Sequence, residues 1–149
     1  MNAVAEIPEV DVGELEKRML VLPQVDVPLT HRFAPGIYMR EVVMPAGSFI
    51  IGHKHKTEHF NVVTKGRALV RMDDSVEEIV APCVFVSGAG VRKILLIVEE
   101  MTWATVHPTT ETDQAKLDEL LIEKSETFLD HEAALAAIEQ LKLAARETN

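Results

Sequence analysis

The sequence predicts a mainly β protein: an antiparallel sandwich or barrel with an N-terminal extended arm and two C-terminal helices. Three observations predict this fold class. Short runs rich in Val, Ile and aromatic residues recur through the middle of the chain, turn-forming residues separate them, and strong helix formers dominate after Pro108. The length of 149 residues suits one ordinary domain. We therefore divide the chain into residues 1–35, 36–108 and 109–149.

The N-terminal arm, residues 1–35, has the composition of an extended segment. Pro8, Pro23 and Pro28 separate short apolar pieces, and proline does not continue a helix. The stretch VGELEKRMLVL is the exception, because its apolar spacing predicts one short helix.

The middle segment, residues 36–108, reads as strand after strand. PAG, KG, DDS, SGAG and EE interrupt it at the intervals expected of turns. Because many short strands at this spacing leave no room for crossover helices, they favour a sandwich or barrel over a parallel sheet. The strand-like runs are GIYMREVVM, SFIIGHKH, HFNVVT, RALVRM, EEIVAPCVFV, RKILLIV and MTWATVH.

The C-terminal segment, residues 109–149, predicts two amphipathic helices. The first lies in TTETDQAKLDELLIEKS, which opens with capping residues and places its leucines on one stripe. The second is expected to begin at the capping residue Asp130. Its narrow apolar seam packs either on the chain's own barrel or on another subunit, and consists of Leu135, Ile138 and Leu141.

Charge and hydropathy exclude several classes of partner. The net charge of −9 argues against nucleic acid, whose binding requires clustered Lys and Arg. No run approaches the roughly 18 apolar residues of a membrane span. The N-terminus has no basic region followed by an apolar core, so we expect no signal peptide and a cytoplasmic protein. Arg92 and Lys93 form the nearest basic pair, which favours a small anionic ligand.

Histidines gather in the stretch GHKHKTEHF. His53 and His55 share one face of a regular strand, and His59 has the same parity. Three neutral imidazoles around one point suit a divalent transition metal such as Fe, Mn, Ni or Zn. The alternative is three ordinary histidines at a solvated strand edge. The clustering favours a mononuclear metal site.

The same stretch resembles the first motif of the cupin superfamily, which runs Gly, five residues, His-x-His, three or four residues, Glu, six residues, Gly. Residues 47–66 match every spacing, with His59 in the glutamate position and Glu58 just before it. The resemblance implies a small antiparallel barrel that holds a metal in its mouth through His53 and His55. By position the resemblance also implies that His59 is a ligand, with an imidazole in place of the family's carboxylate. Glu58 has the opposite parity and is expected to point outward, and it stays a secondary candidate for ligand binding.

The second cupin motif is poorly matched. Residues 82–93 keep a glycine at Gly90, but Lys93 stands where the family has a histidine ligand. The chain is also similar to short cupin-like proteins of tailed bacteriophages, which implies the host cytoplasm as its setting.

His107 is the candidate for the missing ligand. If Glu99 and Glu100 form a two-residue turn, a hairpin pairs His107 with Arg92, and cross-strand partners share a face. A turn of odd length would send His107 outward. A histidine that only ends the sheet before Pro108 is the other alternative.

We expect a three-histidine metal site that opens onto a small-molecule pocket. One hypothesis is a metal-dependent dioxygenase, isomerase or lyase, with no catalytic residue assigned. Its acid/base options are Glu58, Tyr38 and the Arg92–Lys93 pair. The alternative is a non-catalytic module, binding or regulatory, that captures a small anion with the help of Arg92 or Lys93. A third possibility is a structural role with metal-free histidines.

The strand-like run RKILLIV predicts a homodimer. Ile94, Leu96 and Val98 lie on one face, and Leu95 and Ile97 on the other. A small barrel has only one interior, so the outward set needs a cover. The C-terminal helices could supply it within the chain, but they are short and rich in alanine, and a second copy related by a two-fold axis would supply it instead.

Overall fold

The structure is a computed structural model that describes residues 2–6, 10–72 and 75–148. The chain forms two compact units, one of Met1–Glu9 with Val25–Glu123 and one of Val10–Gln24 with Lys124–Asn149. These units do not follow the three segments drawn from composition. The predicted mainly β, antiparallel fold with C-terminal helices is confirmed. Within the described residues no helix is both long and apolar enough to cross a membrane.

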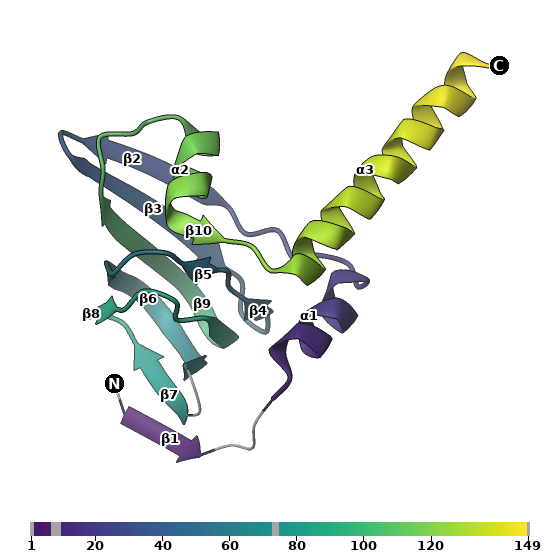
Figure 1. The fold of residues 1–149 in the computed structure, drawn as a ribbon. Helices are drawn as coiled ribbons and strands as arrows, with labels where there is room; N and C mark the ends of the chain where they lie inside the picture. Colours follow the sequence, from purple (N-terminus) through teal and green to yellow (C-terminus); the bar gives the residue numbers. More distant parts are fainter. Residues whose placement is uncertain (1, 7–9, 73–74, 149) are drawn as a thin grey trace. The chain divides into compact units, whose positions relative to one another are not determined.

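The first unit is built on one antiparallel sheet (Figure 1). Its strand order is β1-β7-β6-β9-β3-β2, with β4 pairing on β9 and β8 on β6. The order begins at β1 and ends at β2, so the sheet curves without closing into a barrel. The bounds are β1 (Asn2–Glu6), β2 (Leu29–Ala34), β3 (Ile37–Met44), β4 (Phe49–Ile51), β6 (His59–Met72), β7 (Ser75–Val80), β8 (Cys83–Ser87) and β9 (Lys93–Pro108).

The central strand β9 corrects one expectation. The predicted hairpin at Glu99 and Glu100 is wrong, because the backbone runs through both residues as one strand. Two glutamates lack the positive-φ preference that a tight turn requires. Their side chains instead pair across to the neighbouring strand, Glu99 with Arg67 at 3.8 Å and Glu100 with Lys65 at 2.8 Å. Continued pairing with β6 thus keeps β9 extended.

Strand β6 likewise joins two predicted strands into one, and it bulges at Gly66. The register with β9 shifts between Val63 and Ala68. Gly66 has φ +96°, a conformation that favours glycine, and lies against the backbone of Glu100. The bulge also exchanges the faces of the strand, because odd-numbered residues are buried before it and even-numbered residues after it.

The core fills the concave side of the curved sheet. It draws inward-facing residues from β3, β6, β7 and β9, and Trp103 packs edge-on against Phe85. Burial of these side chains is the main source of stability in a unit of this size. The buried members are Met44, Val63, Ala68, Val70, Ile79, Leu95, Ile97, Met101 and Trp103.

Helix α2 (Gln114–Leu121) belongs to the sheet unit. The Asp113 side chain caps its first turn by accepting from the Lys116 amide at 3.1 Å. Leu117 and Leu121 bury their side chains against Tyr38 of β3. The chain then pairs as β10 (Ile122–Glu123) with β5 (Lys54–His55), which ties the histidine segment to the helix.

The second unit consists of α1 (Val12–Leu20), the short helix predicted in the arm, and α3 (Glu126–Glu147). The predicted start of the last helix at Asp130 is wrong: Ser125 is the N-cap, and its hydroxyl accepts from the Phe128 amide. The same hydroxyl donates to the carboxylate of Glu16 on α1. The predicted seam of α3 is exposed at Leu135, Ile138 and Leu141.

Candidate functional site

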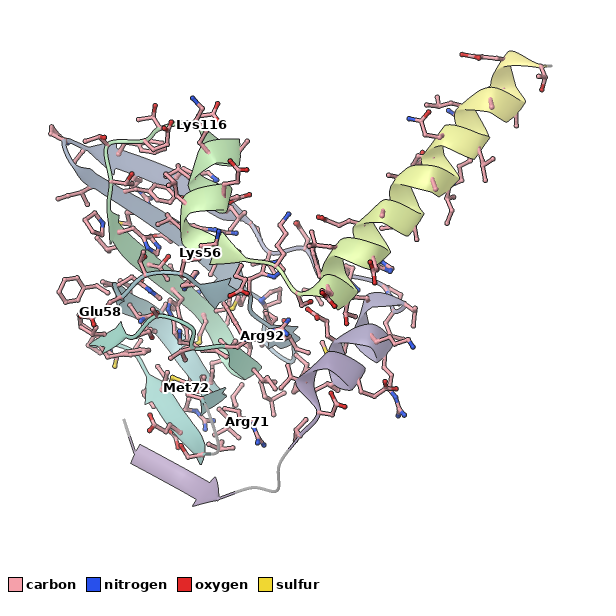
Figure 2. The ribbon with its side chains drawn as sticks, in the orientation of Figure 1. Lys56, Glu58, Arg71, Met72, Arg92 and Lys116 are labelled. Carbon is pink, nitrogen blue, oxygen red and sulfur yellow. The ribbon has the colours of Figure 1, made fainter. Side chains whose placement is uncertain are left out.

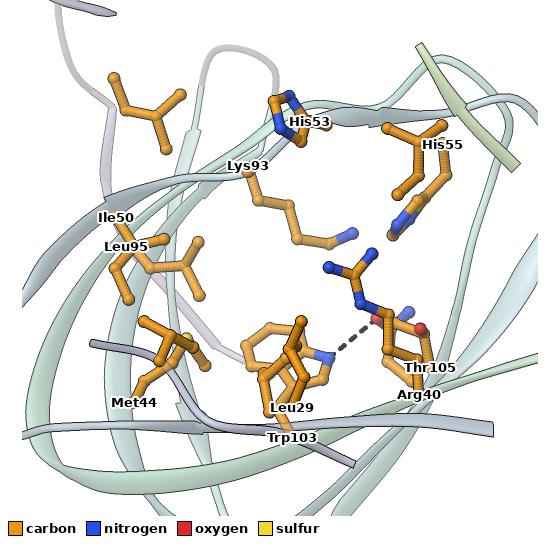
Figure 3. A pocket seen from close by; sticks show the side chains of 16 residues that line it. Leu29, Arg40, Met44, Ile50, His53, His55, Lys93, Leu95, Trp103 and Thr105 are labelled. Carbon is orange, nitrogen blue, oxygen red and sulfur yellow. Dashed lines mark hydrogen bonds between the residues drawn. The ribbon is translucent and has the colours of Figure 1, made fainter. Parts of the chain in front are cut away.

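A cavity of about 300 Å³ lies in the sheet unit between β3, β4 and β9 (Figure 3). Its wall is mostly apolar and includes Leu29, Met44, Ile50, Leu95 and Trp103. Ligand pockets of globular proteins are typically apolar with a few placed polar groups. The polar groups of this cavity therefore decide what it can bind.

Lys93 and Arg40 are the cationic side chains of this wall, and both point into the cavity (Figure 3). Lys93 is only 8% exposed. Among the described residues, no Asp or Glu lines the cavity, and the Nε of Arg40 is buried without a hydrogen-bond acceptor. Burial lowers the pKa of the Lys93 ammonium to about 8, because low-dielectric surroundings disfavour its charge.

Strand periodicity places both cations. On β9, Lys93 shares the inward face with Leu95, and on β3 Arg40 shares the inward face with Val42 and Met44. Sequence reasoning named Lys93 but missed Arg40. The signal was present in the sequence, since Arg40 is the one charged residue at the parity that β3 otherwise fills with Tyr38, Val42 and Met44.

A polar row crosses the floor of the cavity. Arg40, Thr105 and Asn61 occupy paired positions on β3, β9 and β6, and all three line the cavity. Asn61 is fully buried, accepts from the Trp103 indole at 3.0 Å and donates to Ser87 Oγ at 2.9 Å. These bonds fix the orientation of the Asn61 amide. The sequence analysis missed Asn61, which has the same inward parity as His59.

His55, His59 and His107 form a ring cluster beside the cavity. His55 Nδ1 lies 2.9 Å from His59 Nε2, and His107 Nε2 lies 2.9 Å from Thr105 Oγ1. The ring centroids of His59 and His107 are 5.0 Å apart, and those of His55 and His107 are 5.5 Å apart. Of these rings only His55 lines the cavity, so the cluster forms a layer behind it.

These imidazoles are held neutral. Burial, with smaller effects from His59, Lys93, His107 and Arg40, lowers the pKa of His55 to about 3. Burial, followed by His59 and Arg40, lowers the pKa of His107 to about 4. The pKa of His59 is also lowered, mainly by burial, against a hydrogen bond to the Thr57 carbonyl. Near pH 7 the cluster thus adds no positive charge to the two cations of the cavity.

The parity expected of the histidine segment is observed. His53 and His55 are half-buried and line the cavity, whereas Lys54 and Lys56 are exposed. His107 faces inward, but not by the predicted route. The predicted pairing of His107 with Arg92 is wrong. Arg92 immediately precedes β9 and His107 lies near the end of the same uninterrupted strand, so the two cannot face each other across a hairpin. His107 pairs instead with Tyr38 of β3.

Three other residues expected near a ligand do not line the cavity. Glu58 is exposed just before β6 (Figure 2). Arg92 donates from Nε to the Gly52 carbonyl at 2.9 Å. Tyr38 is buried beneath α2, where its hydroxyl lies 2.7 Å from Nδ1 of His31 and its ring stacks on His107. Burial raises the pKa of Tyr38, which keeps the phenol protonated.

The donor set does not fit the expected metal centre. Among the described residues, no group of three or more His, Cys, Asp or Glu side chains has an arrangement that could hold a metal ion. The ammonium of Lys93 and the guanidinium of Arg40 point into the space that His53 and His55 face (Figure 3). Two fixed cations would repel a divalent ion there. Metal binding by the histidines stays a prediction.

Comparisons with known proteins concern the fold. No family model matches the sequence, and no curated protein matches it. The similar solved structures include cupins, among them one from Methanocaldococcus jannaschii with a double-stranded β-helix fold (10% identity, 56% of this chain and 80% of that one, TM-score 0.48). A cupin domain from Bordetella pertussis has 14% identity over 60% of this chain and 99% of its own, with a TM-score of 0.47.

A cupin superfamily protein from Desulfitobacterium hafniense has 10% identity over 72% of this chain and 98% of its own, with a TM-score of 0.49. All three TM-scores lie below 0.5, and the identities are low. The chemistry of the site therefore has to be argued from the side chains of this chain.

Proposed function

We propose that the sheet unit binds a small organic anion, with a carboxylate at one end and a short apolar body. The single observation that supports this most is the joint placement of Lys93 and Arg40 in an otherwise apolar cavity. Within the described residues no carboxylate lines this cavity, so the two positive charges meet no acidic group on its wall.

The electrostatics favour an anion over a neutral ligand. Two cations in low-dielectric surroundings repel each other and have lost part of their hydration. A carboxylate between them would reduce both costs at once. Arg40 suits this role because a guanidinium binds a carboxylate through paired N–H donors, and its Nε has no acceptor among the described residues.

The cavity also sets the size of the ligand. A volume of about 300 Å³ lies at the small end of the range for ligand sites. Leu29, Ile50 and Leu95 would contact an aliphatic chain of a few carbons. We therefore expect a small carboxylic acid, and not a nucleotide or a sugar phosphate.

Titration with hexanoate, followed by NMR chemical shifts, tests the proposal. We expect hexanoate to perturb resonances around the cavity, and the matched neutral amide, hexanamide, to bind at least about tenfold more weakly because it lacks the charge. Lys93→Met, which keeps length and removes the charge, should weaken hexanoate binding by a similar factor.

Lys54→Met is the matched control. Lys54 is the first residue of β5 and is exposed, on the opposite side of the chain from His53 and His55. Its removal should leave hexanoate affinity unchanged. Equal binding of hexanoate and hexanamide, or equal losses in the two lysine variants, would contradict the proposal.

The enzyme hypothesis requires more of this site than anion binding does. A metal-dependent dioxygenase, isomerase or lyase would need the histidines to hold a metal, and that stays a prediction. Anion binding requires only Lys93, Arg40 and the apolar wall. It is therefore the function that the geometry supports best.

A further inference from the structure

Lys93 differs from an ordinary anion-binding lysine. It is 8% exposed, its Nζ makes no hydrogen bond or ion pair to any described residue, and its side chain extends into the cavity instead of toward solvent (Figure 3). A lysine whose only role was to bind an anion would bind it more tightly if its side chain were always protonated. A desolvated amine in an apolar pocket is the usual setting of a nucleophilic lysine.

We propose that Lys93 forms an imine with a small 2-oxo acid whose carboxylate is bound by Arg40. This inference rests on the proposed anion binding and narrows its ligand class. The two side chains enter the same cavity from different strands, Lys93 from the first residue of β9 and Arg40 from the middle of β3. A 2-oxo acid carries its carbonyl carbon next to its carboxylate, so Arg40 would present that carbonyl to the amine.

The covalent step balances without a further reagent. The neutral Nζ attacks the carbonyl carbon, a C–N bond forms as the C=O π bond breaks, and one proton passes from the nitrogen to the oxygen to give a carbinolamine. The second nitrogen proton then balances the proton taken up by the departing hydroxyl, so that the C–O bond breaks, water leaves and the neutral imine remains. No atom is oxidised or reduced, and water is the only product released.

The surroundings favour the reactive form of the amine. Burial lowers the pKa of Lys93 to about 8, so roughly a tenth of the side chains are unprotonated at pH 7. No carboxylate of the described residues lines the cavity to restore the charge. An exposed lysine such as Lys54 has neither the burial nor the adjacent Arg40.

Reductive trapping tests the proposal. The protein is incubated with pyruvate and cyanoborohydride, which reduces an imine to a stable amine, and the adduct is located by peptide mass spectrometry. We expect one adduct per chain on Lys93, formed at least about tenfold more than on Lys54 or Lys56. Lactate, which has no ketone, should give no adduct, and excess hexanoate should protect Lys93.

Two variants separate a nucleophile from a merely structural lysine. Lys93→Arg keeps the positive charge and cannot form an imine, so it should lose the pyruvate adduct. Arg40→Met should reduce trapping of pyruvate about tenfold but trapping of acetone much less, because acetone has no carboxylate for Arg40 to bind.

The outcomes are distinguishable. Hexanoate binding without any pyruvate adduct, or an adduct spread evenly over exposed lysines of the wild-type protein, would overturn the imine and leave the proposed function standing. Absence of hexanoate binding would overturn the proposed function itself. Because the adduct is mapped on the wild-type chain, the test holds even if a variant fails to fold.

Discussion

Single side chains decide what this cavity can bind. His53 and His55 have the spacing of metal ligands, yet Lys93 and Arg40 direct two cations into the space they face. A cation beside potential metal ligands opposes the binding of a metal ion, because Coulomb repulsion between the two positive charges acts across the whole of a small cavity. Replacing Lys93 by histidine would remove one of these two cations and add a third imidazole beside His53 and His55.

The first prediction concerns that substitution. Lys93→His removes the ammonium and adds an imidazole, so it should raise the affinity for Zn²⁺ by at least about tenfold over the wild type. Isothermal titration with Zn²⁺ on chelator-treated protein measures this change. Lys54→His adds the same side chain on the exposed side and should have little effect. A Lys93→His protein that binds Zn²⁺ no better than the wild type would show that Lys93 is not what opposes a metal.

The second prediction concerns acid. Folding lowers the pKa of His107 from 6.5 to about 4, so the unfolded chain binds more protons between these values. This group's contribution to stability is therefore complete above about pH 6.5 and is lost as the pH falls toward 4. The loss from pH 7 to pH 5 should be roughly 2 kcal/mol for a histidine with such a shift.

Urea unfolding of metal-free protein at pH 7 and pH 5 measures this loss. His107→Gln should reduce the difference between the two pH values, because glutamine does not titrate. The titratable and charged groups that face His107 are Tyr38, His55, His59 and Arg40, and they are the same in both proteins. His131→Gln on α3 is the matched control for a histidine-to-glutamine exchange outside the sheet unit. An undiminished difference in His107→Gln would refute the prediction.

At the scale of elements, the long strands β6 and β9 hold the sheet unit together and bring the site residues to one side. β9 alone carries Lys93, Thr105 and His107 on its inward face. β6 carries His59 and Asn61 before its bulge, and the core residues Ala68 and Val70 after it. The bulge at Gly66 is what allows both halves of β6 to face inward with opposite parity.

The third prediction tests that bulge. A Cβ added at Gly66 would lie 2.2 Å from the Glu100 carbonyl oxygen, and the backbone there has φ +96°. Gly66→Ala should therefore lower the free energy of unfolding by about 3 kcal/mol or more, or prevent folding. Gly47 has φ +81° but open space around it, so Gly47→Ala should cost only about 1 kcal/mol. Chemical denaturation of both variants measures the two values, and equal losses would mean that the close approach does not matter.

At the scale of the whole molecule, the outer face of the sheet leaves apolar side chains in solvent. Leu96 and Val98 of β9 are 41% and 36% exposed, and Phe49, the cross-strand partner of Leu96, is 42% exposed. Adjacent exposed apolar groups on a sheet are characteristic of an interaction surface. The homodimer stays a prediction, and Phe49, Leu96 and Val98 are the residues expected to form its interface.

The fourth prediction is that light scattering at micromolar concentration gives about twice the chain mass of 16.6 kDa. A symmetric contact would let Leu96 and Phe49 of one copy cover those of the other. Leu96→Glu should shift the mass toward the monomer by placing a charge in that contact. Val21→Glu, at an exposed apolar site outside the sheet unit, should not. A monomeric wild-type protein would refute the prediction.

The sequence by itself determined the fold class, because alternation, turn residues and helix formers are local signals that need no knowledge of neighbours. It also determined the parity of His53 and His55, which follows from the period of a strand. Only the tertiary structure decided that Glu99 and Glu100 continue β9, because that depends on pairing partners far along the chain. The same holds for Arg40 and Asn61: the sequence carries their parity, but strand order determines that they meet Lys93 around one cavity.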